Sequence, residues 1–157
     1  PAAPLIAGPN AVNGYGKILP RDRPRRMADE FRFTIELPDE VYPLQLTTTR
    51  LHFQYGSGSM TRRAPLLERE NPRGILWIHP VDAAARHIAA GTPVRIRSRR
   101  GEVTTRAVVS DAVRPGTVVM PYHFREAPSN RVTNDALDPL SRMPELKVCA
   151  VAVEPLP

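Results

Sequence analysis

A polar loop near the C-terminus, residues 125–147, holds the side chains of this chain that are best suited to binding a ligand. Asn130 and Asn134 offer amides and Lys147 offers an ammonium group, and such groups can read the polar edge of a flat heterocycle. An apolar run ending at Phe124 precedes the loop and a strand-like run beginning at Cys149 follows it, so two strands can hold it rigidly. Several of its Asn and Asp residues serve equally well as turn residues. We predict a binding loop here.

A second polar group, Thr47–Arg50, follows a run in which apolar and polar residues alternate. Thr48 and Thr49 offer hydroxyl and backbone N–H groups, and Arg50 offers a guanidinium group, an array that suits a pyrophosphate. On the residue pattern alone, an ordinary strand rich in threonine is the simpler explanation. Both interpretations stay open at this point.

The next segment, Leu51–Ser59, combines polar side chains with two glycines. Gly56 and Gly58 would let the backbone approach a ligand closely, and Gln54 and Tyr55 add polar groups beside them. A flexible surface loop is the alternative. The segment is neither a phosphate-binding P-loop nor a Rossmann fingerprint, because the Gly-Lys-Ser/Thr run and the GxGxxG spacing are both absent.

Cysteine and histidine residues give no sign of a nucleophile or a metal site. Cys149 is the only cysteine and lies among valines and alanines, a position typical of a small buried hydrophobe. The histidines are not spaced as metal ligands, and no CxxC, HExxH or nucleophile-elbow motif is present. We therefore predict no catalytic and no metal-binding residue in this chain. The histidines are His52, His79, His87 and His123.

Length and composition indicate one small, β-rich domain. The chain has 157 residues, and its 18 prolines and nine glycines favour many turns and little long helix. No apolar run approaches the roughly 20 residues that span a bilayer, and no signal segment is evident. The chain starts with Pro1, as a processed or excised product would. With one cysteine and no possible internal disulfide, we expect a cytoplasmic protein without a membrane span.

The net charge of +6 would suit a nucleic-acid partner. The arginines, however, are dispersed over separate segments and are not interleaved with aromatic residues that could form a stacking platform. We therefore expect no nucleic-acid partner. A non-enzymatic, arginine-rich barrel that binds protein or nucleic acid stays as an alternative, and a steep loss of duplex affinity with added salt would identify it.

The chain divides into an N-terminal segment and one domain. Residues 1–38 are rich in proline and glycine and lack sustained periodicity, which predicts a linker or a wrapping arm. Within it, the alternating run Phe31–Leu37 is suited to an edge strand. Residues 39–157 are expected to form the domain.

Closely spaced apolar runs predict a small closed or partly closed β-barrel. The short segment Arg99–Gly101 predicts a hairpin turn whose arginines are simply solvated. Two short helices are expected, one over Pro80–Ala90 that is stopped by Gly91 and one over Met60–Glu70. The expected strands are Tyr42–Thr48, Ile75–Ile78, Val94–Ser98, Val103–Val109, Val118–Tyr122 and Cys149–Val153.

Several motifs, in order along the chain, resemble those of one oxidoreductase family. The closing segment of molybdenum- or tungsten-dependent formate dehydrogenases, within the dimethyl sulfoxide reductase family, is similar to Met120–Phe124, Glu126–Asn130, Leu137–Pro139 and Pro144–Val151. The same pattern is matched upstream by Tyr42–Arg50, Ser59–Arg63 and Arg97–Gly101. The resemblance covers about residues 42–154 and is more specific than one short motif. It implies a double-psi β-barrel.

The resemblance also implies a function. The chain would bind and cover a molybdopterin guanine dinucleotide, as the C-terminal domain or a small subunit of a formate-dehydrogenase-like oxidoreductase that oxidises formate to carbon dioxide. The metal, Mo or W, would be held by the cofactor and by a residue outside this chain. The partners would be the remaining catalytic domains or subunits, and the isolated chain would not be catalytic. The implied cofactor-binding residues are Thr48, Thr49, Arg50, Gln54, Tyr55, Gly56, His123, Asn130 and Lys147.

Two alternatives remain within the family. The barrel of a formylmethanofuran dehydrogenase or of a nitrate-reductase-like enzyme would bind the same cofactor and serve a different substrate.

Overall fold

The computed structural model describes residues 36–137 and 142–157. The strands in this part are β1 (Leu44–Thr49), β2 (Ile75–Ile78), β3 (Pro93–Arg97), β4 (Glu102–Val109), β5 (Thr117–Pro121) and β6 (Cys149–Pro155). The helices are the 3-10 turns η1 (Thr61–Arg63) and η2 (Ser129–Arg131) and the α-helices α2 (Pro65–Glu70) and α3 (Pro80–Ala85). Every predicted strand is confirmed, with its ends within two residues of the expected positions.

The predicted N-terminal linker lies almost wholly in residues 1–35, outside the described residues. The same holds for most of the expected edge strand Phe31–Leu37. Only Glu36 and Leu37 of that run are described, and neither lies in a strand.

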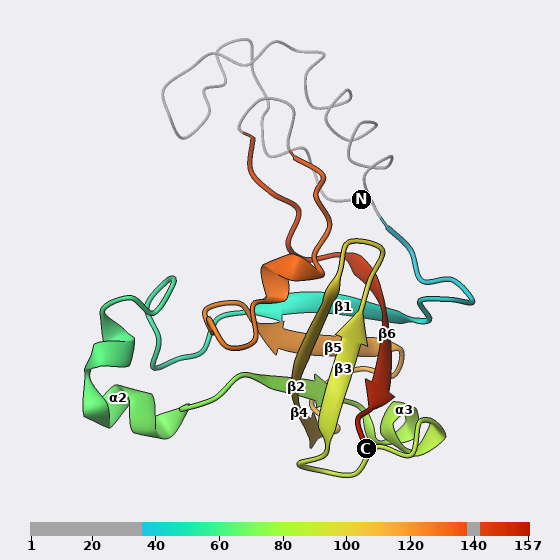
Figure 1. The fold of residues 1–157 in the computed structure, drawn as a ribbon, viewed down its shortest axis with the longest axis horizontal. Coiled ribbons are helices and arrows are strands. Elements are labelled where there is room, and N and C mark those ends of the chain that lie inside the picture. Colours follow the sequence, from blue (N-terminus) through green and yellow to red (C-terminus); the bar gives the residue numbers. More distant parts are fainter. Residues whose placement is uncertain (1–35, 138–141) are drawn as a thin grey trace, which may run out of the picture. The chain divides into compact units, whose positions relative to one another are not determined.

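The six strands close into one barrel in the order β1-β5-β2-β4-β3-β6 (Figure 1). β1 runs parallel to β5 and β2 runs parallel to β4, whereas the other neighbours are antiparallel. The parallel neighbours in the barrel wall are thus strands that do not follow one another in the sequence. This arrangement confirms the expected double-psi β-barrel. Closure also pairs both edges of every strand, which removes the exposed edges that invite aggregation.

The strands follow either an alternating or a continuous apolar pattern. In β1 and in β3, buried positions alternate with more exposed ones, as expected when one face packs inside a barrel. The first five residues of β6 are all buried. The largest fully buried side chains form one core: Phe124, Leu44, Leu46, Leu76, Ile78, Ile96, Met120, Val94, Val118, Val132 and Val151.

The predicted hairpin at Arg99–Gly101 is confirmed, because β3 and β4 pair antiparallel on either side of it. Helix α3 begins at Pro80 as expected, and the His79 ring caps it by accepting a hydrogen bond from the Val81 N–H at 3.1 Å. The predicted end at Gly91 is wrong, because the helix stops at Ala85.

Packing of one apolar side chain explains the early end of α3. His87 adopts a left-handed conformation, with φ of 55°, and the Ile88 N–H donates to the Ala83 carbonyl at 2.9 Å. This is the Schellman pattern of helix termination, and it turns the buried Ile88 into the core. Gly91, with φ of +80°, instead serves the turn that leads into β3.

The second predicted helix, Met60–Glu70, is confirmed in position but is not continuous. It divides into η1 and α2 at Ala64, which has an extended backbone. Pro65 disfavours helical geometry at the preceding residue and suits the first position of a new helix. Within residues 36–137 and 142–157, no helix is long and apolar enough to cross a membrane.

Candidate functional site

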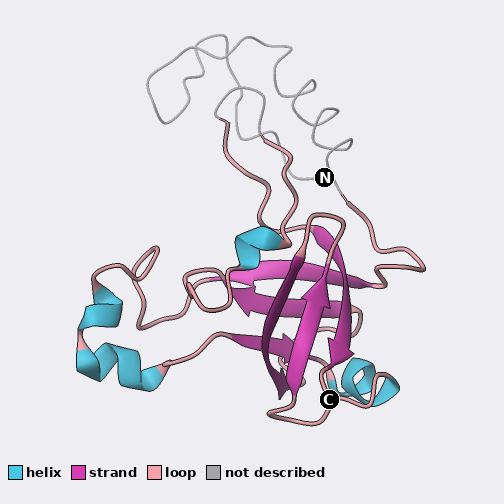
Figure 2. Cartoon of the chain, viewed as in Figure 1, coloured by secondary structure: helices cyan, strands magenta, loops and turns pink. Residues whose placement is uncertain are grey.

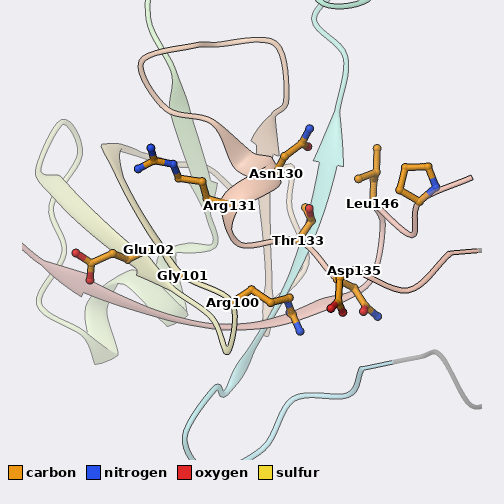
Figure 3. A pocket seen from close by; sticks show the side chains of 10 residues that line it. Arg100, Gly101, Glu102, Asn130, Arg131, Thr133, Asp135 and Leu146 are labelled. Carbon is orange, nitrogen blue, oxygen red and sulfur yellow. The ribbon is translucent and has the colours of Figure 1, made fainter.

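A pocket of about 660 Å³ lies where the β3–β4 turn, η2 and the segment before β6 meet (Figure 3). These three segments are far apart in the sequence, and the barrel brings them to one place. The pocket combines two arginines, two carboxylates, two amides and a hydroxyl. It is lined by Arg100, Gly101, Glu102, Asn130, Arg131, Thr133, Asn134, Asp135, Pro144 and Leu146.

The 3-10 turn η2 positions Asn130 and Thr133. Val132 is fully buried, and the N–H groups of Val132 and Thr133 both donate to the Ser129 carbonyl, at 2.9 and 3.1 Å. This tight turn fixes the backbone that carries the two polar side chains. Neither side chain has a hydrogen bond to another described residue, so both keep their hydrogen-bonding groups for a ligand.

Arg100 forms one wall of the pocket. Its guanidinium donates to the Val132 carbonyl at 3.4 Å and to the Cys149 sulfur at 3.1 Å, and it pairs with Glu36. The prediction of a simply solvated turn is therefore wrong for this residue. The Cβ of an alanine at position 101 would lie 3.0 Å from the Arg131 carbonyl oxygen. Gly101 thus lets the hairpin approach η2. In the sequence, this glycine beside two arginines was the feature that could have indicated a pocket wall here.

The end of β1 adjoins the pocket. The Thr48 hydroxyl donates to the Leu146 carbonyl at 2.9 Å, and the Lys147 ammonium donates to the Thr48 carbonyl. These bonds place the threonine–arginine run beside the segment with Lys147, and Leu146 in that segment lines the pocket. Thr48 is buried and its hydroxyl is already bonded, so it supports the site and does not face a ligand freely.

Arg50 directly follows β1 and is exposed. Its guanidinium forms no hydrogen bond or ion pair with another residue in 36–137 and 142–157. The Thr49 hydroxyl donates to the Arg50 carbonyl at 3.2 Å, which shapes this corner. Arg50 does not line the pocket, but its guanidinium is free for an anion next to it.

Gln54, Tyr55 and Gly56 lie outside the pocket lining. Gln54 is buried, and its amide accepts from the Thr61 hydroxyl at 2.6 Å and donates to Glu68 at 3.3 Å. These bonds give Gln54 the role of holding its own loop together. Tyr55 is largely exposed, and Gly56 has φ of +54° with open space around it.

His123 is buried beneath the same loop. An added Cβ on Gly58 would lie 3.3 Å from the His123 ring, and that ring packs 4.0 Å from the Phe124 ring. Burial lowers the pKa of His123, and the nearby Arg62 charge lowers it further. Its Nε2 atom is buried and has no partner among the described residues. His123 does not line the pocket.

Ion pairs neutralise part of the positive charge of the domain. Within the described part of the chain, six arginines form ion pairs with carboxylates, which weakens the case for a basic nucleic-acid platform. These are Arg62, Arg69, Arg86, Arg97, Arg99 and Arg100. No cluster of three His, Cys, Asp or Glu residues suited to a metal ion occurs in residues 36–137 and 142–157.

Comparison with known proteins identifies relatives over the region that forms the barrel. Residues 44–150 match the model of the molydopterin dinucleotide binding domain. The F420-dependent formate dehydrogenase subunit alpha of Methanocaldococcus jannaschii is 46% identical over 142 residues, which is 90% of this chain and 20% of that protein. The F420-dependent formate dehydrogenase 2 subunit alpha of Methanococcus maripaludis is 44% identical, with the same coverage.

A solved structure supports the fold. Acetylene hydratase from Pelobacter acetylenicus superimposes with a TM-score of 0.64 at 19% identity, over 72% of this chain and 18% of that protein. At this identity the likeness concerns the fold alone. The chain spans about a fifth of the length of each of these longer relatives.

Proposed function

The chain belongs to the molydopterin dinucleotide binding domain family, and we propose that it holds a molybdopterin guanine dinucleotide within a formate-dehydrogenase-like oxidoreductase. The family match supports a molybdopterin-type cofactor. The guanine dinucleotide form, the Mo or W ion and its ligand outside this chain belong to the proposal. So do the oxidation of formate to carbon dioxide and a location in the cytoplasm.

The observation that carries the proposal is a polar pocket with two unpaired side chains, beside an unpaired guanidinium. Asn130 and Thr133 have unused hydrogen-bonding groups at the pocket, and Arg50 is unpaired at the adjoining end of β1. A pterin dinucleotide presents flat polar ring edges and a diphosphate, so amide, hydroxyl and guanidinium groups suit it. The residues present therefore fit the cofactor.

Each residue has a defined task in this proposal. Arg50 pairs with the diphosphate, Asn130 bonds a ring edge, and Thr133 adds a hydroxyl to the same site. Lys147 and Thr48 hold each other and thereby fix the corner that carries Thr49 and Arg50. Gln54, Tyr55 and Gly56 on the loop after Arg50, and His123 beneath that loop, stay predicted contacts.

The chain contributes binding and cover, and the chemistry lies elsewhere. When bound, the cofactor supplies the metal centre that accepts the two electrons released as formate becomes carbon dioxide and a proton. The side chains of this domain orient the cofactor and exclude water from one face of it. The partners are then the remaining domains of the oxidoreductase, which correspond to the other four-fifths of the relatives.

The substrate assignment follows the relatives. The two relatives named above are formate dehydrogenase subunits at 44–46% identity, which supports formate over the formylmethanofuran and nitrate alternatives. No comparable observation favours either alternative.

Cofactor retention tests the proposal. Arg50→Ala and Asn130→Ala are introduced into the complete oxidoreductase, and the purified proteins are assayed for molybdenum or tungsten and for released guanine nucleotide. Each variant should lose about tenfold in cofactor affinity, the effect of one charge-assisted or well-formed hydrogen bond.

Arg114→Ala is the matched control. Arg114 is exposed and precedes β5, which runs parallel to β1, so it lies at the opposite end of the barrel from Arg50. Its replacement should leave the cofactor content unchanged. Full retention in both test variants would contradict the site.

A further inference from the structure

Residues 51–70 stand apart from the strands of the barrel (Figure 2). They are here named the arm, which is a different segment from the N-terminal residues 1–38. The arm contains η1 and α2, and neither helix has a buried residue. Helices of three and six residues are far below the length at which an isolated helix is stable in water. The arm must therefore be held by contacts outside its own helices.

One side of the arm is fixed to the barrel by Arg62. Its guanidinium donates to Glu68 and to Glu126, both at 3.0 Å, and lies 5.1 Å from the centre of the Phe124 ring. Gly58 permits this packing, because a Cβ there would lie 3.0 Å from the Arg62 side chain. The contacts to Glu126 and Phe124 tie the arm to the segment that follows β5.

Other side chains of the arm are apolar and uncovered. Met60 and Leu66 are each 70% exposed and Phe53 is 41% exposed. Scattered apolar residues are ordinary on protein surfaces, but these three occur within 14 residues of a segment that has almost no core of its own. Exposed apolar side chains on a weakly stabilised projection are typical of a surface that another protein surface covers.

We infer that Phe53, Met60 and Leu66 dock the remainder of the larger oxidoreductase onto this domain. The inference rests on the proposed function, since it requires the additional domains. About four-fifths of each formate dehydrogenase relative lies beyond the region this chain matches, so a large surface is available in a covalently joined protein. Because joined domains meet at high effective concentration, a small apolar contact is sufficient.

The position and charge of the arm agree with this occupant. The arm begins directly after Arg50, at the end of β1 that adjoins the proposed cofactor site, so a domain docked on the arm would lie next to that end of β1. Arg63 on the arm and Arg73 just beyond it are exposed and have no carboxylate partner among the described residues, whereas Arg62 and Arg69 are paired. The docked surface is therefore apolar with a carboxylate-rich margin.

Hydrogen exchange measured by mass spectrometry tests the docking surface. The complete oxidoreductase is produced in cells that cannot make the pterin cofactor, and exchange in residues 51–70 is compared with exchange in the 157-residue chain. We expect exchange to be at least about tenfold slower in the complete protein. The double variant Met60→Ser/Leu66→Ser should abolish most of this protection, and Val81→Ser, which removes an exposed apolar side chain on α3, should not.

The hydrogen-exchange results test the docking surface separately from the cofactor assignment. Equal exchange in the complete protein and the 157-residue chain would overturn the docking surface, as would an arm already protected in the 157-residue chain. Protection that Met60→Ser/Leu66→Ser leaves intact would overturn it as well. Since the cofactor is absent throughout, failure of the cofactor assignment leaves these readings unaffected.

Discussion

Arg50 and Arg100 are both arginines next to a strand, and their surroundings give them different roles. Arg50 is exposed and unpaired within the described residues, so its charge is available to a ligand. Arg100 is mostly covered and is held by Glu36 and the Val132 carbonyl, so it shapes the pocket wall. The buried Nε atom of Arg100 has no partner in the described part, which leaves a donor for a bound ligand or water.

Cys149 should be chemically inert in the folded chain. Burial raises the pKa of its thiol to about 11 and the Val132 carbonyl accepts from it at 2.6 Å. Since the thiolate is the reactive form, reaction with a disulfide reagent at pH 8 should be about a hundredfold slower than in the unfolded chain. The same chain in guanidinium chloride provides the control rate. Comparable rates in the two states would contradict the assignment of Cys149 as structural.

His123 should make stability depend on pH. Burial, and then the Arg62 charge, lowers the pKa of His123 below its usual value of 6.5, while the nearby Glu68 and Glu126 partly oppose this. The unfolded chain therefore binds the proton more readily than the folded chain. The contribution of His123 to the free energy of unfolding is present above about pH 6.5 and is lost as the pH falls below that value. Urea midpoints at pH 7.5 and pH 5.5 should differ less in His123→Gln than in the parent.

His52→Gln controls for the loss of a histidine as such, because His52 is exposed. It should keep the parent's dependence on pH. If the urea midpoint of His123→Gln depends on pH as strongly as that of the parent, His123 is not the source of the dependence.

At the scale of elements, the arm depends on one ion-pair cluster. Hydrogen bonds to Glu126 and Glu68 raise the pKa of the Arg62 guanidinium, so it is charged at all accessible pH values. Arg62→Ala would leave two carboxylates without their partner. We expect the opening free energy of residues 51–70 to fall by about 1–2 kcal/mol, after allowance for the exposure of Glu126. Exchange in the barrel strands should not change.

Arg69→Ala is the matched control for this prediction. Arg69 is largely exposed and lies 3.6 Å from Glu70, a pair that contributes little. Equal effects of the two substitutions on the arm would show that Arg62 is not its anchor.

The entry to β2 depends on a close approach between two segments. A Cβ on Gly74 would lie 2.7 Å from the Ala127 methyl group, so Gly74→Ala should destabilise the chain by about 1–3 kcal/mol. Chemical denaturation measures this loss. The double variant Gly74→Ala/Ala127→Gly removes the opposing methyl group and should recover part of it, whereas no recovery would place the cost elsewhere.

At the scale of the whole molecule, β6 closes the barrel by pairing with both β1 and β3. A chain that ends at Val148 would lose the buried Val151 and Val153, at a cost of about 3–6 kcal/mol. It would also leave two strand edges unpaired. Since domains of this size are stable by only about 5–15 kcal/mol, we expect no cooperative thermal transition. A chain that lacks only the exposed Pro157 should melt like the parent.

Local patterns in the sequence determined the strands, the family and several site residues. Closely spaced apolar runs, some of them alternating with polar residues, predicted all six strands within two residues of their observed ends. The ordered motifs predicted the family, which the match over residues 44–150 confirms. These features depend on neighbouring residues, so a linear pattern contains them.

Only the tertiary structure decided the rest, because contacts between distant segments leave no mark on local periodicity. Ile88 packs into the core and ends α3 before its sequence preference would. Arg100 meets Glu36 and Val132 across the fold, which gives it a place in the pocket wall. The pocket itself exists because barrel closure brings the β3–β4 turn, η2 and the segment before β6 together.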